Sequence, residues 1–458
     1  MRLPEVFQRF AEKRPICVMA RGVLERLFDT ERINQIFEAT AERGSTRNIL
    51  FSTLVKLMSQ VVLGVRPSVH AAFQALEEHE ATFSSTAMYN KLDRVEPRVS
   101  TELVRDSATQ ASEVIDVLGG QLPPRLPGYR CRILDGNHLS ATEHRIKELR
   151  HTWAAPLPGR SLVVLDPARM IAETVVLTED GHASERSLLD QVLLLVQPQD
   201  VWIADRNFCT LLFLWGILRR QGYFVIRQHG QLKGRLVGRK RKLGKCATGV
   251  VYEQRIVFVD PDTGQAGEEE FRRITIKLNT PTRDGDTELH ILTNLPEADA
   301  DAAMIAELYA GRWTIEKAFH QLTETLKCEI DTLGYPKAAL FAFCLALMAY
   351  NAVAVLKAAL RVAHGADVVE NTVSAYYISL DLLATDEGMM IAIPAEHWKI
   401  FRTMHLQRLA KVLLELAFGV NLARYRKHPR GPKKPPPKKS HYKNGGHVST
   451  FKLINGLE

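Results

Sequence analysis

Two apolar, strand-like segments in the middle of the chain each run directly into an aspartate. Residues 129–134 precede Asp135, and residues 200–204 precede Asp205. A carboxylate beside an apolar core needs a partner, because an isolated charge there is strongly disfavoured. Arg206 could supply one in a structural ion pair, or a bound cation could serve both aspartates. A helical run and another strand follow Asp205, and this alternation favours an α/β sheet covered by helices on its faces.

A later helical segment, residues 308–327, brings a third candidate carboxylate. At 3.6 residues per turn, its polar side chains fall on one stripe, beside an apolar stripe that would anchor the helix. The polar stripe consists of Tyr309, Arg312, Glu316, His320 and Thr323. A single Glu on such a stripe is usually only solvated. Together with Asp135 and Asp205, Glu316 completes a set of three oxygen donors that suits divalent cations, with Mg²⁺ as the default, and the two-ion chemistry of phosphoryl transfer.

The sequence around these three carboxylates resembles the DDE transposases of the bacterial insertion sequence 4 family. The motifs that carry the resemblance lie at residues 135–139, 204–208 and 309–316, and the resemblance covers about residues 50–440. It implies an RNase H-like catalytic fold that is interrupted by a β-rich insertion between the second Asp and the Glu. It also implies that Asp135, Asp205 and Glu316 are the catalytic residues and hold two Mg²⁺ ions, or Mn²⁺ in their place, at each active site.

The third motif departs from the family pattern at one position. The family signature is Tyr-x2-Arg-x3-Glu-x6-Lys, and it maps onto Tyr309, Arg312 and Glu316, but Thr323 stands where the family has Lys. In the family that Lys assists contact with DNA phosphates. Either Lys317 or Lys327 substitutes for it, or the contact is weaker in this protein.

The net charge of +8 is concentrated in two segments. Residues 231–250 hold seven Lys or Arg and no acid, and residues 424–443 hold nine and no acid, so subtracting these 16 charges leaves the rest of the chain at −8. Such clustering indicates that a polyanion is gripped at particular places, although solubilising loops show the same pattern. The expected DNA contacts are Tyr309, Arg312, Arg206 and Lys327 near the acidic residues, and Arg239, Lys240, Arg241 and Lys242 in the first basic segment.

Periodicity and composition divide the chain into three parts. Residues 1–125 read as helical and are expected to form a DNA-binding domain. Residues 126–420 are expected to form the RNase H-like catalytic domain, with antiparallel strands inserted at about 232–289 and a strand at 290–295 that returns to the main sheet. Residues 421–458 form a basic tail that we expect to be a loose tether, and its Pro/Lys run at 424–443 is expected to be disordered without its partner.

A possible helix-turn-helix lies within the first part. Residues 68–80 and 84–95 would form two helices, the second of which begins after Ser84 or Ser85 as its N-cap. The second helix could read a DNA groove, although helical hairpins are also common without DNA. Its candidate polar contacts are Tyr89, Asn90, Lys91 and Arg94.

Other sequence features limit the class of protein. The six cysteines are scattered, which argues against a disulfide framework or a structural zinc site and favours a reducing cytoplasm. The resemblance to a bacterial family implies association with the bacterial nucleoid. The start of the chain lacks the apolar run of a signal peptide. The apolar run at 338–356 approaches the length of a membrane span, but it is rich in Ala and contains Asn351, so we predict a buried helix. Asp166 follows an apolar strand and is interpreted as a turn residue before Pro167.

The resemblance implies a transposase that cleaves DNA at the ends of its own element and joins the freed 3′-hydroxyls to target DNA. Water would be the first nucleophile and the 3′-hydroxyl the second, without a covalent enzyme intermediate. Because two element ends are joined, we expect a homodimer in the DNA complex. Two alternatives remain: an RNase H-like nuclease that cleaves but never joins, and an inactive transposase-derived DNA-binding protein, which Thr323 would suit.

Overall fold

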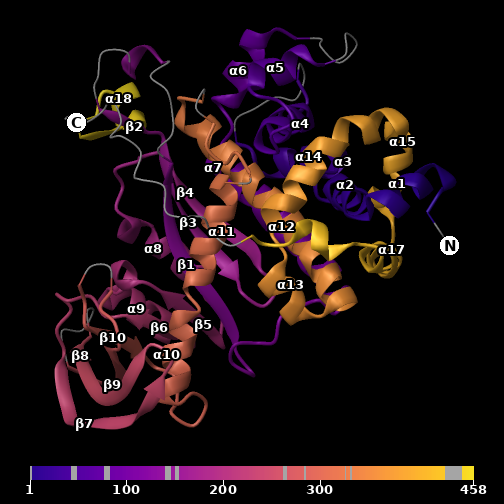
Figure 1. The fold of residues 1–458 in the computed structure, drawn as a ribbon. Helices are drawn as coiled ribbons and strands as arrows, with labels where there is room; N and C mark the ends of the chain where they lie inside the picture. The colour runs from indigo at the N-terminus through magenta and orange to yellow at the C-terminus, as the bar shows by residue number, and fades with distance from the viewer. Residues whose placement is uncertain are drawn as a thin grey trace.

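The protein is a mixed α/β structure built on one large mixed sheet (Figure 1). The computed structural model describes residues 3–42, 49–76, 83–139, 146–149, 154–260, 266–282, 285–324, 326–330, 333–428 and 446–457. The nine strands of the sheet lie in the order β4-β3-β1-β5-β6-β10-β9-β8-β7. Their bounds are β1 Arg130–Leu139, β3 Gly159–Asp166, β4 Ile171–Thr178, β5 Asp200–Ala204, β6 Tyr223–Arg227, β7 Arg235–Cys246, β8 Gly249–Val259, β9 Ala266–Leu278 and β10 Glu288–Thr293.

Helices surround the sheet and fill the rest of the described chain. Before the sheet come α1 Gln8–Lys13, α2 Pro15–Leu27, α3 Thr30–Thr40, α4 Phe51–Val62, α5 Val69–Gln74, α6 Ser85–Leu92 and α7 Pro97–Leu118. Between and after the strands come α8 Leu189–Leu193, α9 Leu211–Arg219, α10 Ala302–Ala310, α11 Trp313–Glu324, α12 Pro336–His364, α13 Ala366–Thr372, α14 Ala375–Ala392, α15 Ala395–Trp398, α16 Ile400–Thr403, α17 Leu406–Phe418 and α18 Thr450–Ile454. The short elements are η1 Glu5–Phe7, η2 Lys147–Leu149, η3 Glu185–Leu188, η4 Arg206–Phe208, η5 Leu422–Tyr425, β2 Ala155–Leu157 and β11 His447–Ser449.

The centre of the sheet follows the predicted α/β pattern. β5 is a short strand whose residues are all buried, as expected for a strand covered on both faces. It lies parallel to β1 on one side and to β6 on the other. Parallel neighbours need a crossover, and α9 provides it between β5 and β6, beginning where the Thr210 hydroxyl accepts a hydrogen bond from the Phe213 N–H at 3.3 Å.

β1 is longer than the sequence suggested. We expected this strand to end at Asp135, but it continues to Leu139. The reason is its second neighbour: β3 lies antiparallel to β1 and pairs Asp135 with Val163 and Leu139 with Gly159. Asp135 therefore lies inside a strand, one residue beyond the point where β1 stops pairing with β5.

The apolar run in the last third of the chain forms α12, which is buried as predicted. Among the described helices, only α12 is long and apolar enough to cross a membrane, with a mean hydropathy of 2.2 over its best window, and that window is completely buried. Asn351 is compatible with this burial because its amide is fully used. It donates to the Ala172 carbonyl at 3.0 Å and to the Ser107 hydroxyl at 3.1 Å, and it accepts from the Ala172 N–H at 2.8 Å.

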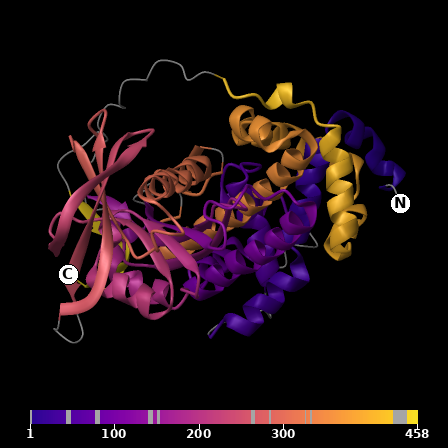
Figure 2. The same ribbon diagram turned by 90° about the horizontal axis from the view of Figure 1, so that it is seen from below.

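The N-terminal helices are packed against this same core. α7 runs along both α12 and β4, and one cluster of buried apolar side chains extends from α3 through the sheet to α12. In Figure 2 the strands of the insertion stand at one end of the molecule and the N-terminal helices at the other. Whether residues 1–125 are a separate domain stays a prediction.

The expected helix-turn-helix is only partly supported. α5 and α6 are short, residues 77–82 lie outside the described residues, and Ser84 caps α6 as predicted by accepting from the Ala87 N–H at 3.2 Å. Lys91 is turned toward the protein, because its ammonium group donates to the Ile49 carbonyl and burial lowers its pKa. Lys91 therefore contacts the protein in this structure, and its expected contact with a DNA groove stays a prediction.

The strands of the expected insertion are confirmed. β7, β8 and β9 are antiparallel, and β10 returns the chain to the main sheet by pairing with β6. A buried ion pair holds this part together, with Arg272 Nε 2.9 Å from Glu253 Oε1 and Arg272 Nη2 3.0 Å from Glu253 Oε2. Arg272 Nη1 also donates to the carbonyls of Leu295 and Ala300, at 3.0 and 2.7 Å, which tie the insertion to the segment before α10.

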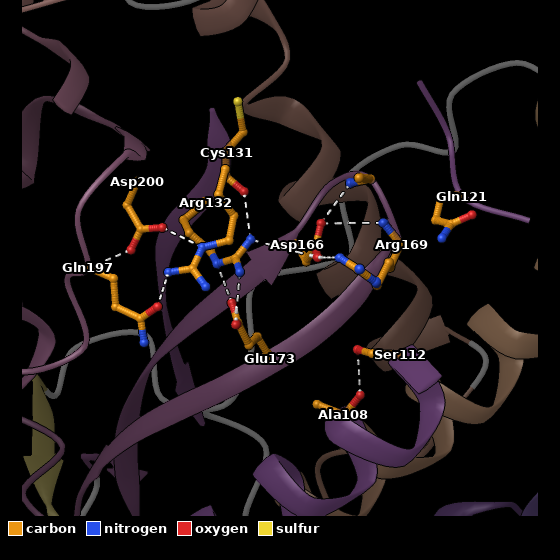
Figure 3. A network of polar contacts seen from close by, with 12 residues as sticks. Ala108, Ser112, Gln121, Cys131, Arg132, Asp166, Arg169, Glu173, Gln197 and Asp200 are labelled. Carbon is orange, nitrogen blue, oxygen red and sulfur yellow. Dashed lines mark hydrogen bonds and ion pairs between the residues drawn. The ribbon is translucent and has the colours of Figure 1, made fainter. Parts of the chain in front are cut away.

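A network of charged side chains lies at the end of the sheet where β1 and β5 begin (Figure 3). Arg132 donates to Glu173 at 3.0 Å and lies 3.7 Å from Asp166, while Arg130 pairs with the buried Asp200 at 2.6 Å. Asp166 also accepts from the Ala168 N–H at 2.9 Å, which confirms it as a turn residue. These carboxylates have arginine partners in the structure, so the network is structural and lies away from Asp135 and Asp205.

The last residues of the chain, which follow the Pro/Lys run expected to be disordered at 424–443, form two short elements. β11 pairs in parallel with β2, and α18 follows it, capped by the Ser449 hydroxyl. Ser449 also donates to Asp180 at 2.6 Å, and Thr450 is fully buried. The reason is composition: after the Pro/Lys run, residues 447–454 again contain apolar and β-branched residues. Residues 429–445 lie outside the described residues, and their role as a DNA tether stays a prediction.

Candidate active site at the ends of the central strands

The expected single helix at residues 308–327 is wrong, because the chain turns in its middle. α10 ends at Ala310 and α11 begins at Trp313. Arg125 causes the break: a Cβ atom on Gly311 would lie 1.5 Å from Arg125 Nη1, and Arg125 Nη2 donates to the Thr314 hydroxyl at 2.7 Å. Because Gly311 has no side chain, the guanidinium of Arg125, which is distant in the sequence, can pack against it. Helical periodicity does not reveal such a contact.

Two of the three carboxylates, those of Asp135 and Glu316, lie on either side of Arg312. Arg312 Nη1 lies 3.2 Å from Asp135 Oδ2, and Arg312 Nη2 lies 2.6 Å from Glu316 Oε1. The side chain of Arg312 is only 10% exposed, whereas that of Glu316 is 52% exposed. α11 packs beside β1 (Figure 1), so the glutamate on the helix reaches the aspartate on the strand.

Asp205 takes its position from the neighbouring strand. Because Leu134 pairs with Ala204 in parallel register, Asp135 and Asp205 follow at adjacent positions on adjacent strands. Asp205 is the N-cap of η4, and its Oδ1 accepts from the Asn207 N–H at 2.6 Å. The predicted meeting of the two strand-end aspartates is therefore present in the structure.

The electrostatics of the site centre on Asp135. The pKa of the Asp135 carboxyl is raised to about 7, mainly by burial and to a smaller extent by the charges of Asp205 and Glu316, while Arg312 and the Gly136 N–H lower it. Burial also raises the pKa of Tyr309, which lies close to Arg312 and Asp205. Tyr309 is thus a buried neighbour of the acidic residues and is not an exposed side chain on a polar stripe.

We expect Asp135 to give the cation-free protein a distinctive dependence of stability on pH. Its folded-state pKa of about 7 lies above the unfolded value of about 3.9. The stabilising contribution of the protonated carboxyl is therefore complete below about pH 4 and is lost as the pH rises through 7. Relative to Asp135→Asn, whose side chain cannot ionise, the wild-type protein should lose on the order of 4 kcal/mol over this range.

The measurement is chemical denaturation of both proteins in EDTA at pH 4 to 8. The difference between them isolates Asp135 from other groups that titrate in this range, such as Asp93, whose pKa burial raises to about 7. A difference that is independent of pH would contradict this assignment. With a divalent cation present, the ionised form is the one that binds, so cation affinity should increase as the pH rises through 7.

The carboxylate oxygens of Asp135, Asp205 and Glu316 are suitable ligands for a divalent cation, but in this structure they are too far apart to bind one together. Asp135, Asp205 and Glu316 offer the hard oxygen donors that Mg²⁺ and Mn²⁺ prefer. Within the described ranges, however, no three acidic, His or Cys side chains are close enough together to form a metal site. Arg312 supplies the positive charge between Asp135 and Glu316 instead. A cation there requires Arg312 to move aside.

Two arginines, Arg206 and Arg227, lie near the acidic residues and contact Asp286. Arg206 lies at the start of η4, and its Nη1 is 4.0 Å from Asp286. Asp286 also pairs with Arg227 at 2.6 Å. The sequence analysis did not select Arg227. This residue ends β6, the strand that lies parallel to β5. A search for charged residues at the ends of apolar strands, which selected Asp205, would also have found it. Both arginines therefore lie at the same edge of the sheet as Asp135 and Asp205.

Lys327 lies in a different setting. Its backbone N–H donates to the Val62 carbonyl at 2.8 Å, and its side chain passes within 3.8 Å of where a Cβ on Gly64 would be. The structure therefore places this residue against the turn after α4. The side chain of Thr323, at the position of the family lysine, lies outside the described residues.

The four expected basic contacts on β7 do not form one group. Lys240 Nζ lies 3.8 Å from Glu288 and 4.8 Å from the centre of the Tyr252 ring, whereas Arg241 pairs with Glu297 at 3.4 Å. Alternate side chains of a strand point to opposite faces. All four, including Arg239 and Lys242, are exposed, but two of them already face acidic side chains.

The fold and these residues define an α/β protein with acidic side chains at one edge of its central sheet. Residues 126–352 match the family model described as the transposase DDE domain, and this stretch contains Asp135, Asp205 and Glu316. The chain therefore carries a transposase DDE domain.

Comparison with individual proteins adds little to this. No curated protein matches the chain. Seven chains of solved structures match, among them one from the cryo-EM structure of the piggyBac transposase synaptic complex with hairpin DNA. That match has 10% sequence identity, covers 93% of this chain and 87% of the other, and has a TM-score of 0.40, which is too low to assign the fold.

Proposed function

We propose that this protein is a DNA transposase of the insertion sequence 4 type, which cleaves the ends of its element and joins the freed 3′-hydroxyls to target DNA. The observation that carries the proposal is the neighbouring position of Asp135 and Asp205 on adjacent parallel strands, with Glu316 linked to Asp135 through Arg312. All of these residues lie within the matched transposase DDE domain. A homodimer on the DNA and a location in the bacterial cytoplasm belong to the same proposal.

An RNase H-like catalytic core is part of the proposal. It is supported by the sheet of antiparallel β4, β3 and β1 followed by parallel β5 and β6, and by strands β7–β9 inserted between Asp205 and Glu316. This is the order of parts that the resemblance to the insertion sequence 4 family implies. The acidic residues lie where β1 stops pairing with β5, the edge at which open α/β sheets present their sites.

In this proposal the cations activate the attacking group, and residues of the chain hold the cations and bind the DNA phosphates. Mg²⁺ or Mn²⁺ held by Asp135, Asp205 and Glu316 would activate the attacking hydroxyl and stabilise the leaving oxygen. Asp135 must be ionised to hold a cation, and Arg312 stabilises that ionised form in its absence. When Arg312 gives way, its guanidinium can bind a DNA phosphate, and Arg206 and Arg227 offer two more phosphate contacts nearby.

The test uses DNA that carries the inverted repeats flanking the gene. The purified protein should nick this DNA at the repeat ends with Mg²⁺ or Mn²⁺, and not in EDTA, and should then join the 3′ ends to a second DNA. Cleavage without joining would favour a nuclease. Binding without any cleavage would favour an inactive DNA-binding protein.

The ion pairs on β7 lead to a prediction about DNA affinity. Arg239→Gln with Lys242→Gln and Lys240→Gln with Arg241→Gln each remove two positive charges. In the part of the chain that the structure describes, only the second pair lies beside acidic residues, Glu288 and Glu297. Each phosphate contact contributes about 0.9 to the slope of log affinity against log salt. The first double variant should therefore flatten the slope by about 2 and the second by less than about 1.

Binding titrations at several salt concentrations measure both slopes, and the two double variants serve as controls for each other because they change charge equally. Equal slopes for the two variants would mean that the contacts with Glu288 and Glu297 do not persist on DNA. Unchanged slopes for both would remove β7 from the DNA interface.

A further inference from the structure

A fourth carboxylate, that of Glu185, lies next to the backbone that carries Asp135. Glu185 begins η3, after Ser184 as its N-cap. A Cβ atom on Gly136 would lie 2.1 Å from Glu185 Oε1, so only glycine allows the carboxylate to approach so closely. Gly136 follows Asp135 directly, and its N–H donates to Asp135 Oδ1 at 3.0 Å. Glu185 therefore touches the residue that orients Asp135.

The other oxygen of Glu185 reaches the second aspartate. Glu185 Oε2 accepts a hydrogen bond from Asn207 Nδ2, and the Asn207 N–H donates to Asp205 Oδ1 at 2.6 Å. The next residue holds the same segment, since Arg186 Nε donates to the Asn207 carbonyl at 2.8 Å. One carboxylate thus contacts both the residue after Asp135 and Asn207, whose N–H is capped by Asp205.

We propose that Glu185 is a positioning residue that fixes the separation and orientation of Asp135 and Asp205, and this proposal rests on the proposed function. Strand pairing sets the spacing of the two backbones at about 4.8 Å, but the directions of the two carboxylates depend on Gly136 and Asn207. Partners behind metal ligands typically change cation affinity or activity 10- to 100-fold when they are removed. Glu185 acts here through hydrogen bonding and packing, without contact with the reacting atoms.

Two other roles for Glu185 are separable from this one. If its negative charge were itself a cation ligand, the neutral glutamine would be as damaging as alanine. If it only stabilised the loop, cation affinity would not respond to its removal in a protein that remains folded. Gln at 185 keeps an oxygen that can accept from Asn207 Nδ2 and has nearly the same shape, so it distinguishes hydrogen bonding from charge.

The experiment measures Mn²⁺ binding by calorimetry with MnCl₂ on the full chain without DNA, and then DNA cleavage as a function of Mn²⁺. Glu185→Ala and Asn207→Ala should each weaken Mn²⁺ binding by about 10- to 100-fold, and Glu185→Gln by less than about threefold. The Glu185→Ala, Asn207→Ala double variant should be no worse than either single variant, because both remove one interaction. Asp190→Ala, an exposed carboxylate on α8, is the matched control and should bind Mn²⁺ as the wild type does.

Thermal melting of each variant identifies any that fails to fold, and Asn207→Ala tests the same link without altering Glu185. Positioning is overturned if Glu185→Gln loses as much affinity as Glu185→Ala, or if Glu185→Ala and Asn207→Ala both bind Mn²⁺ like the wild type. Failure of the proposed function looks different, because then the wild-type protein itself neither binds Mn²⁺ at this site nor cleaves DNA.

Discussion

Asp135→Ala should abolish strand cleavage, with a loss of about 10³- to 10⁴-fold or more, while DNA binding stays within about threefold of the wild type. Asp205→Ala should behave in the same way. Both aspartates supply oxygen ligands for the cations at the proposed site. DNA binding should persist without them, because phosphates are held by basic residues. The measurement is single-turnover cleavage of a terminal-repeat DNA at saturating protein, together with a binding titration of the same DNA.

The control must separate catalysis from a general effect of losing a carboxylate. Glu307→Ala removes an exposed carboxylate from α10, and it should cleave like the wild type. Asp135→Ala also leaves Arg312 paired with Glu316 alone, so its stability should be measured alongside. Cleavage at the wild-type rate by either aspartate variant would remove that residue from the active site.

The buried pair of Arg272 and Glu253 should show the largest effect on stability. Arg272→Met leaves the carboxylate of Glu253 buried without a partner, so it should lower the free energy of unfolding by about 3–5 kcal/mol. Adding Glu253→Leu removes the unpaired charge and should recover at least about 2 kcal/mol of that loss. Full recovery is not expected, because the carbonyls of Leu295 and Ala300 also lose their donor.

Chemical denaturation of the two single variants and the double variant gives the coupling energy directly. An exposed pair within the same structure provides the comparison: Arg255 lies 3.8 Å from Glu297 with both side chains about half exposed, so Arg255→Met should change stability by at most about 1 kcal/mol. If the double variant loses the sum of the two single losses, the pair is not coupled and its burial does not explain the stability of the insertion.

The sequence predicted those parts of the site that depend on short stretches of chain. Apolar strands ending at Asp135 and Asp205 were visible in the sequence, and parallel register then places the two aspartates side by side. The strands of the insertion and the buried α12 were also predictable from periodicity and composition.

The features that could not be predicted all depend on residues far apart in the chain. The turn at Gly311 exists because Arg125 inserts there, and β1 continues past Asp135 because β3 pairs with it. Glu185 lies in a loop whose sequence shows nothing unusual, and its contacts with Gly136 and Asn207 exist only in the folded protein. Such contacts leave no periodic pattern in the sequence.

The strands of the insertion are hydrogen-bonded to the main sheet, so the position of β7 relative to the acidic residues is fixed, and this sets the length of DNA that the protein can cover. β7 lies five strands from β5 in the sheet order, and strands are spaced about 4.8 Å apart, so β7 stands at most about 24 Å from the strand that ends at Asp205. Base pairs of B-DNA rise by about 3.4 Å each. A duplex held by both places should thus be protected from nucleases for at most about seven base pairs beyond the cleaved bond. Because strands set this distance, the protected length is a fixed property of the fold and should be the same on every DNA sequence that the protein binds.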